Sequence, residues 1–169
     1  MAFIIENNTV ISFAEFQDVV DRDQRIFGAN EGLTDDVVES SLIRATERIL
    51  TQLRSTDWWR SYYLNQSTNF SYSSVADIPP LDPNRIQDRK EDFTDLCVYV
   101  ALSDFILPGV ADFANDDSAE RKKMGYYKQR ATELFGELVT AGDWYNFDGT
   151  GTISSKEKMP GQFNLKRVR

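Results

Sequence analysis

The segment from residue 146 to residue 157 has the spacing of a twelve-residue EF-hand calcium loop. Side-chain oxygens stand at loop positions one, three and five, a backbone carbonyl is available at position seven, and a glutamate stands at position twelve. In order, these candidate ligands are Asn146, Asp148, Thr150, Thr152 and Glu157, with Gly151 at position six. Calcium prefers such oxygen ligands, but two of the side chains are neutral where the motif favours aspartate. The spacing therefore predicts a calcium site of low affinity.

The same residues also fit a simple turn. Gly149 and Gly151 can adopt a positive φ without steric cost, which lets a chain leave a helix and change direction. Pro160 would stop the helix that follows an EF-hand loop almost where it begins. The sequence leaves both interpretations open, and it predicts no cofactor beyond a weakly bound calcium ion.

The sequence contains few residues that could carry catalysis. The chain contains no histidine, which removes the commonest general base, the usual metal ligand and the usual partner of a nucleophilic serine or cysteine. The acidic pairs at 35–36 and 116–117 stand where helices are expected to begin, and carboxylates are favoured there by the helix dipole. The single cysteine, Cys97, lies in an apolar run and is expected to be a buried hydrophobe. We therefore expect a protein that is not an enzyme.

Two segments are candidates for contacts with other proteins. Trp58, Trp59, Tyr62 and Tyr63 fall within eight residues and must be either core or a protein interface, because exposed aromatic groups would form a sticky patch. The second segment is a basic C-terminal arm made of Gln162, Phe163, Asn164, Leu165, Lys166, Arg167, Val168 and Arg169. It could remain a solvated tail, contact nucleic acid, or order on a partner as an added strand.

Charge separates this arm from the rest of the chain. The whole chain has a formal net charge of −8, but residues 156–169 hold five basic residues against one acidic residue and carry +4. The other 155 residues hold 14 basic and 26 acidic residues and carry −12. A groove that neutralises many phosphates is therefore not expected, and nucleic acid is not the predicted ligand.

Helical periodicity and capping signals predict four helices, at residues 13–27, 35–55, 83–107 and 118–141, and the loop, the aromatic segment and the arm lie between or after them. The capping signals that begin these helices are, in order, Ser12 with Glu15, Thr34, Asp82 with Pro83, and Asp117 with Glu120. Gly142 is expected to end the last helix. Residues 65–82 form a long loop rich in Ser, Asn and Asp. The predicted fold is all-α: an antiparallel bundle of about four helices, with a helical body at 1–145 and an extended arm with the EF-hand-like turn at 146–169.

Membrane insertion is not expected. No stretch approaches the ~18 uncharged apolar residues of a membrane helix, and Glu6 interrupts the first ten residues where a signal peptide would be basic and then apolar. We expect a soluble, intracellular protein.

Residues 12–16 (SFAEF), 25–27 (RIF), 33–36 (LTDD) and 42–50 (LIRATERIL) belong to the first two predicted helices, and residues 95–102 (DLCVYVAL) and 106–108 (ILP) to the third. Together with the basic tail, these segments resemble the head-tail connector proteins of tailed bacteriophages, also called adaptor or head-completion proteins. The first group looks like the two opening helices of that family, and the second is similar to its buried helix. The basic tail resembles its portal-binding extension, and the resemblance covers most of the chain.

The resemblance implies a structural virion protein of the neck, assembled in the host cytoplasm. Twelve copies would form a ring below the portal protein, with the C-terminal arm on the portal and the lower face receiving a stopper or tail-terminator protein. DNA would pass through the channel without specific binding, since an acidic lining repels it. The alternative, from another class, is a calcium-responsive protein-binding module that uses the loop at 146–157.

Overall fold

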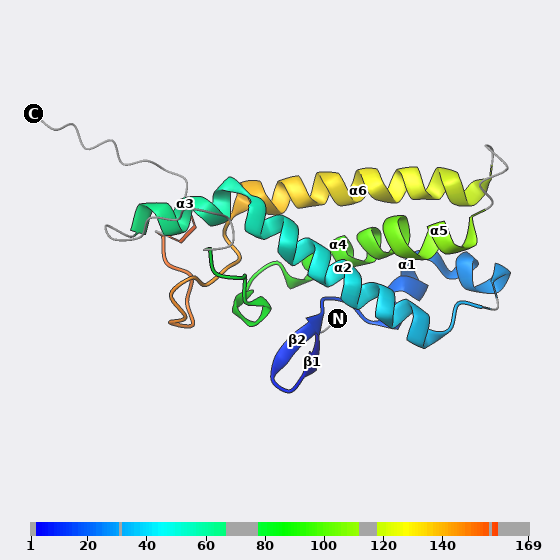
Figure 1. Ribbon diagram of the computed structural model, residues 1–169, viewed down its shortest axis with the longest axis horizontal. Coiled ribbons are helices and arrows are strands. Elements are labelled where there is room, and N and C mark those ends of the chain that lie inside the picture. Colours follow the sequence, from blue (N-terminus) through cyan, green and yellow to red (C-terminus); the bar gives the residue numbers. More distant parts are fainter. Residues whose placement is uncertain (1–2, 31, 67–77, 112–117, 156, 159–169) are drawn as a thin grey trace, which may run out of the picture.

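A computed structural model describes residues 3–30, 32–66, 78–111, 118–155 and 157–158. The described chain is mostly helical and carries a small two-stranded hairpin (Figure 1). Its elements are β1 (Ile4–Glu6), β2 (Thr9–Ser12), α1 (Phe16–Ala29), α2 (Asp35–Ser55), α3 (Asp57–Gln66), a 3-10 turn (Pro83–Arg85), α4 (Lys90–Ala101), a π-helical turn (Leu102–Ile106), α5 (Leu107–Val110) and α6 (Ala119–Ala141). The prediction of a helical fold is confirmed at this level.

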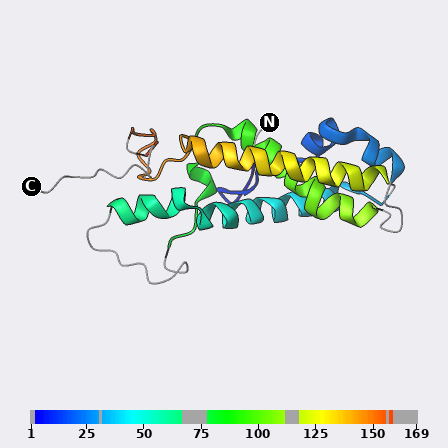
Figure 2. The same ribbon diagram turned by 90° about the horizontal axis from the view of Figure 1, so that it is seen from above.

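Helix α4 is the centre of the fold. It packs against α1, α2 and α6, and its residues from Phe93 to Ala101 are buried, except for half-buried Asp95. The body is elongated, with α6 running along one side for most of its length (Figures 1 and 2). Helix α4 is therefore a core helix over most of its length.

Two of the predicted helices agree closely with the structure. Helix α2 begins at Asp35 after Thr34, ends at Ser55, and buries the predicted stripe of Val38, Leu42, Ala45, Ile49 and Leu53. Helix α6 ends at Ala141, with Gly142 in the left-handed conformation as its C-terminal cap. Its N-terminal cap is Ser118, whose hydroxyl accepts the Arg121 N–H, and Asp117 lies outside the described residues.

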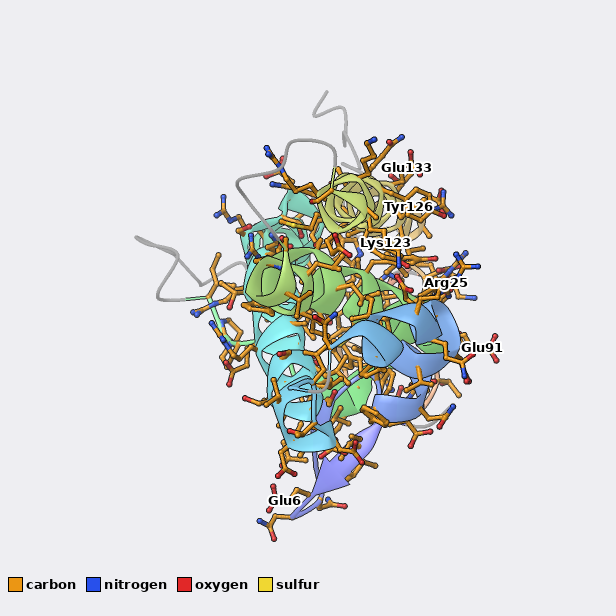
Figure 3. The ribbon with its side chains drawn as sticks, turned by 90° about the vertical axis from the view of Figure 1, so that its right-hand side faces the viewer. Glu6, Arg25, Glu91, Lys123, Tyr126 and Glu133 are labelled. Carbon is orange, nitrogen blue, oxygen red and sulfur yellow. The ribbon has the colours of Figure 1, made fainter. Side chains whose placement is uncertain are left out.

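The hairpin corrects the all-α prediction. Ile5 pairs with Val10, and Glu6 pairs with Thr9. Asn7 and Asn8 between them both have positive φ, at 49° and 63°, which suits the tight turn of a two-residue hairpin. Glu6 lies at the far tip of the molecule in Figure 3. Strands of three and four residues are too short to show a convincing alternation in the sequence.

Because β2 ends at Ser12, the first helix begins later than predicted. Its N-terminal cap is Glu15, and the carboxylate of Asp18 accepts the Glu15 N–H at 2.9 Å, so the capping box lies at 15 and 18 rather than at 12 and 15. Ser12 instead bonds within the turn, where its hydroxyl donates to the Ala14 carbonyl.

The third helix also begins later than predicted. The Asp82 side chain accepts the Asn84 N–H, but this cap serves only the 3-10 turn, and α4 starts at Lys90 after Arg89 adopts a positive φ of 56°. Between them Ile86 forms a β-bridge with Tyr145. The residues before α4 therefore hold the chain that follows α6.

The segment Lys90–Val110 is long and apolar enough to cross a membrane by length and composition, contrary to our expectation from the sequence. In this fold 67% of that window is buried inside the chain, as in the core helix of a soluble protein. Cys97 lies on this segment, fully buried, with its sulfur 3.4 Å from the Thr46 hydroxyl. This burial confirms the prediction of a buried core cysteine, and it raises the pKa of the thiol to about 12.

Candidate functional site

The first part of the predicted arm is folded into the body. Phe147 and Glu157 retain only 5% and 2% of their exposure, and Trp144, Tyr145 and Asn146 are also buried. The core packing therefore continues past residue 145, the predicted boundary between body and arm, to include Asn146, Phe147 and Glu157.

Backbone pairing fixes this segment against the residues before α4. The Gln87 N–H donates to the Trp144 carbonyl at 3.0 Å, and the Asn146 N–H donates to the Arg85 carbonyl at 3.0 Å. The Arg85 guanidinium also donates to the Phe147 carbonyl at 2.7 Å. The chain after α6 is thus held by hydrogen bonds to residues some sixty positions earlier.

An aromatic cluster joins this segment to α3. The rings of Trp58 and Trp144 lie 4.5 Å apart, and Phe147 stacks on Tyr62 at 3.8 Å and on Trp59 at 5.3 Å between ring centroids. Offset and edge-to-face contacts of this kind stabilise beyond the area they bury. The cluster contains Trp58, Trp59, Tyr62, Tyr63, Phe93, Trp144, Tyr145 and Phe147.

The sequence left open whether the aromatic residues at 58–63 are core or interface, and the structure places Trp58 and Trp59 in the core. Trp58 is 8% exposed and Trp59 is fully buried, so both belong to the core and offer no surface to a partner. Tyr62 and Tyr63 are half-buried at the edge of the cluster. Their partners at 144–147 were missed in the sequence, although a Trp-Tyr-x-Phe run directly after a helix stop was the available signal.

The loop at 146–157 is closed by its own hydrogen bonds. One carboxylate oxygen of Glu157 accepts the N–H groups of Phe147 (2.7 Å) and Asp148 (3.0 Å), and the other accepts that of Ser154 (2.6 Å). Gly149 and Gly151 have φ of 73° and 85°, as the turn interpretation requires.

The other predicted calcium ligands are engaged in the same way. The Asn146 side-chain oxygen accepts the Gly149 N–H at 2.8 Å. The Asp148 carboxylate accepts both the N–H and the hydroxyl of Thr150, and that hydroxyl also lies 3.3 Å from the Thr152 carbonyl. Each candidate side chain therefore has a partner within the loop.

Electrostatics agree with this arrangement. Burial raises the pKa of Glu157, but the hydrogen bonds from Ser154, Asp148 and Phe147 outweigh it and the net pKa lies below the ordinary value. A bidentate calcium ligand presents both oxygens to the ion, whereas both oxygens of Glu157 are bound to backbone N–H groups. Across the described residues, no group of three or more His, Cys, Asp or Glu side chains is placed to hold a metal. The geometry favours the turn, and the calcium site stays a prediction.

The anchored turn lies at one end of the body. In Figures 1 and 2 the orange residues that follow α6 lie at the same end as α3. The turn ends at Lys158, and the predicted docking residues 162–169 lie outside the described part of the chain. The site can therefore act as a fixed base from which the basic segment starts.

Comparisons with family models, curated proteins and solved structures found no match to this chain. The assignment of a function therefore depends on the residues and geometry described above.

Proposed function

We propose that this protein is a structural head-tail connector of a tailed bacteriophage, which docks on the portal ring through its basic C-terminal segment. The observation that carries the proposal is the anchored turn at one end of an elongated helical body. The turn fixes the start of a segment whose charge is opposite to that of the body, +4 for residues 156–169 against −12 for the remainder.

The arrangement of the helices supports the proposal. Several segments that carry the resemblance lie on helices, with residues 25–27 on α1, 42–50 on α2 and 95–101 on α4, and the burial of α4 supports the likeness to the family's buried helix. We infer that α1, α2, α4 and α6 are the four principal helices of the expected antiparallel bundle. In the assembled neck, twelve such bodies form the ring.

The charge distribution suits this role. An acidic body around a channel repels passing DNA, whereas a basic arm is drawn to a different surface. The portal binds the arm, the opposite face of the ring receives the stopper or tail-terminator protein, and the protein performs no catalysis. It works in the virion neck and is assembled in the host cytoplasm.

Co-sedimentation with the portal ring of the same phage tests the proposal. The chain ending at Lys158 keeps the anchored turn but lacks the docking residues, and Lys166→Glu with Arg167→Glu keeps the length but reverses the charge. We expect full-length protein to sediment with the portal and both altered forms to remain in the supernatant.

The matched control reverses two exposed charges of the body, Arg25 on α1 and Lys128 on α6. This variant should sediment like the unaltered protein. Binding that is equal in all four forms, or absent in all four, would overturn the proposal.

A further inference from the structure

The outer face of α6 carries an open groove of about 600 Å³ near its C-terminal end. It is lined by Arg89, Glu133, Gly136, Glu137, Thr140 and Ala141. The α6 residues recur every three or four positions, so they share one face of the helix. Figure 3 shows Glu133 pointing outward from this helix. The groove is therefore an unpartnered helix face with small residues between acidic ones.

Gly136 is unusual within this face. A glycine inside a helix costs about 1 kcal/mol relative to alanine. A Cβ added at Gly136 would meet nothing within 4 Å, so the described part of the chain gives no packing reason for the glycine. A bare backbone at this position allows another chain to approach closely.

The charged residues that line the groove are two acids, Glu133 and Glu137, and one base, Arg89. Glu133 pairs with Arg130, and Arg89 donates to Asp143 at 2.7 and 3.2 Å and to Asp92 at 3.4 Å. Among the described residues, Glu137 makes no ion pair. Because Arg89 is already paired with Asp143 and Asp92, Glu137 leaves the lining with an unbalanced negative charge, and the groove favours a positively charged occupant.

Residues 159–169 have the chemistry and the position to be that occupant. They contain three basic residues and no acidic one, together with the apolar residues Met159, Phe163, Leu165 and Val168. The segment starts after Lys158. The pKa of Asp143, at the end of the groove, lies below its ordinary value, mainly because Arg89 donates a hydrogen bond to it and in smaller part because of the charge of Lys158.

The segment is also long enough. Eleven extended residues reach about 36–40 Å. The nine α6 residues from 133 to 141 span only about 13 Å of helix. A short flexible link gives an effective concentration in the millimolar range, which exceeds that of a second copy at micromolar protein.

We propose that in the free protein residues 159–169 bind back on the α6 groove of the same molecule, with the basic side chains beside Glu133 and Glu137. The portal must then displace the segment from the groove before the arm can dock, a regulatory role that rests on the proposed function. The intramolecular contact itself does not depend on it.

Paramagnetic relaxation in the free, full-length protein tests this contact. Cys97 is fully buried, so a nitroxide reagent will label only the cysteine introduced by Val168→Cys. We expect the amide signals of residues 133–141 to lose intensity several-fold relative to those of α2. Uniform weak losses, or losses centred on another element, would overturn the proposal.

Charge variants and mixing make the test specific. Glu133→Lys with Glu137→Lys should restore the lost intensity, whereas the control Glu39→Lys with Glu47→Lys on α2 should not. Salt at about 1 M shortens the screening length to about 3 Å and should also restore the lost intensity.

If isotope-labelled protein without nitroxide shows the same losses when mixed with nitroxide-labelled protein, the segment occupies a neighbouring copy and the proposal is wrong. Neither result changes the outcome of portal co-sedimentation.

Discussion

Glu157 is the buried acid that closes the C-terminal turn. Its two oxygens accept three backbone N–H groups from both ends of the loop, and its side chain is almost fully buried. The positive φ at Gly149 and Gly151 was predictable, because glycine-rich turns favour it. The burial of Glu157 was not, because its partners are backbone groups whose position depends on the folded turn.

Replacing Glu157 with alanine should lower the free energy of unfolding by about 2–4 kcal/mol, because a charge-assisted acceptor is lost and buried N–H groups are left unpaired. Urea unfolding measures the loss. The control Asp148→Ala should cost about 1 kcal/mol or less, since its bonds to Thr150 lie in exposed surface. Millimolar calcium should leave the melting temperature of the unaltered protein unchanged; a rise would support the calcium module instead.

The lowered pKa of Glu157 also predicts an acid dependence. A carboxyl whose folded pKa lies below its unfolded value of about 4.3 contributes stability that is present above that value. This stability is lost as the pH falls from about 4.3 toward the folded pKa. We expect unfolding free energies measured by urea between pH 7 and pH 3 to fall less steeply for Glu157→Gln than for the unaltered protein. Parallel curves would show that Glu157 titrates normally in the folded state.

At the scale of elements, α6 and α3 meet at Gly142. Gly142 has a φ of 57°, and a Cβ there would lie 2.7 Å from the Trp58 indole nitrogen. Gly151 has a φ of 85°, but a Cβ there would meet nothing within 4 Å. Alanine at Gly151 would therefore meet only backbone strain, whereas alanine at Gly142 would meet both strain and a clash with Trp58.

Gly142→Ala should therefore destabilise the protein more than Gly151→Ala. The second variant should lose only the backbone strain energy, about 1–2 kcal/mol of unfolding free energy. We expect the difference between the two variants to be at least about 1 kcal/mol, the usual cost of overpacking a core. Thermal unfolding followed by circular dichroism gives both values. Equal losses would mean that Trp58 moves away without cost.

The elements differ in how far the sequence determines them. Helix α2 was predictable because its buried stripe from Val38 to Leu53 repeats at the helical period over about four turns, and α6 because Gly142 marks its end. The start of α4 was not. The signal at Asp82 and Pro83 serves a 3-10 turn, and the following residues pair with Tyr145 and its neighbours, a contact across some sixty positions.

At the scale of the whole molecule, the aromatic cluster joins α3, in the middle of the sequence, to the residues that follow α6. Residues of α3 stack on residues that follow α6, so Asn146, Phe147 and Glu157 are part of the core. The sequence placed the aromatic residues and the basic tail, but not the partner of the aromatic segment, because tertiary contacts at this separation leave no local pattern.

A chain ending at Tyr145 should consequently be much less stable than one ending at Lys158. The shorter form loses both Phe147 from the cluster and the Glu157 closure, and removal of a buried phenylalanine side chain alone costs about 3–5 kcal/mol. The longer form should melt close to the full-length protein. Circular dichroism melting compares the three chains, and similar melting temperatures for all of them would contradict the assigned role of residues 146–158.

We propose that the protein forms a ring on the portal through its C-terminal segment. Electron microscopy of portal rings incubated with excess protein tests it most directly. We predict an added ring of density beneath the portal with the full-length chain, and bare portals with the chain ending at Lys158. Added density with the shortened chain, or none with the full-length chain, would contradict the claim.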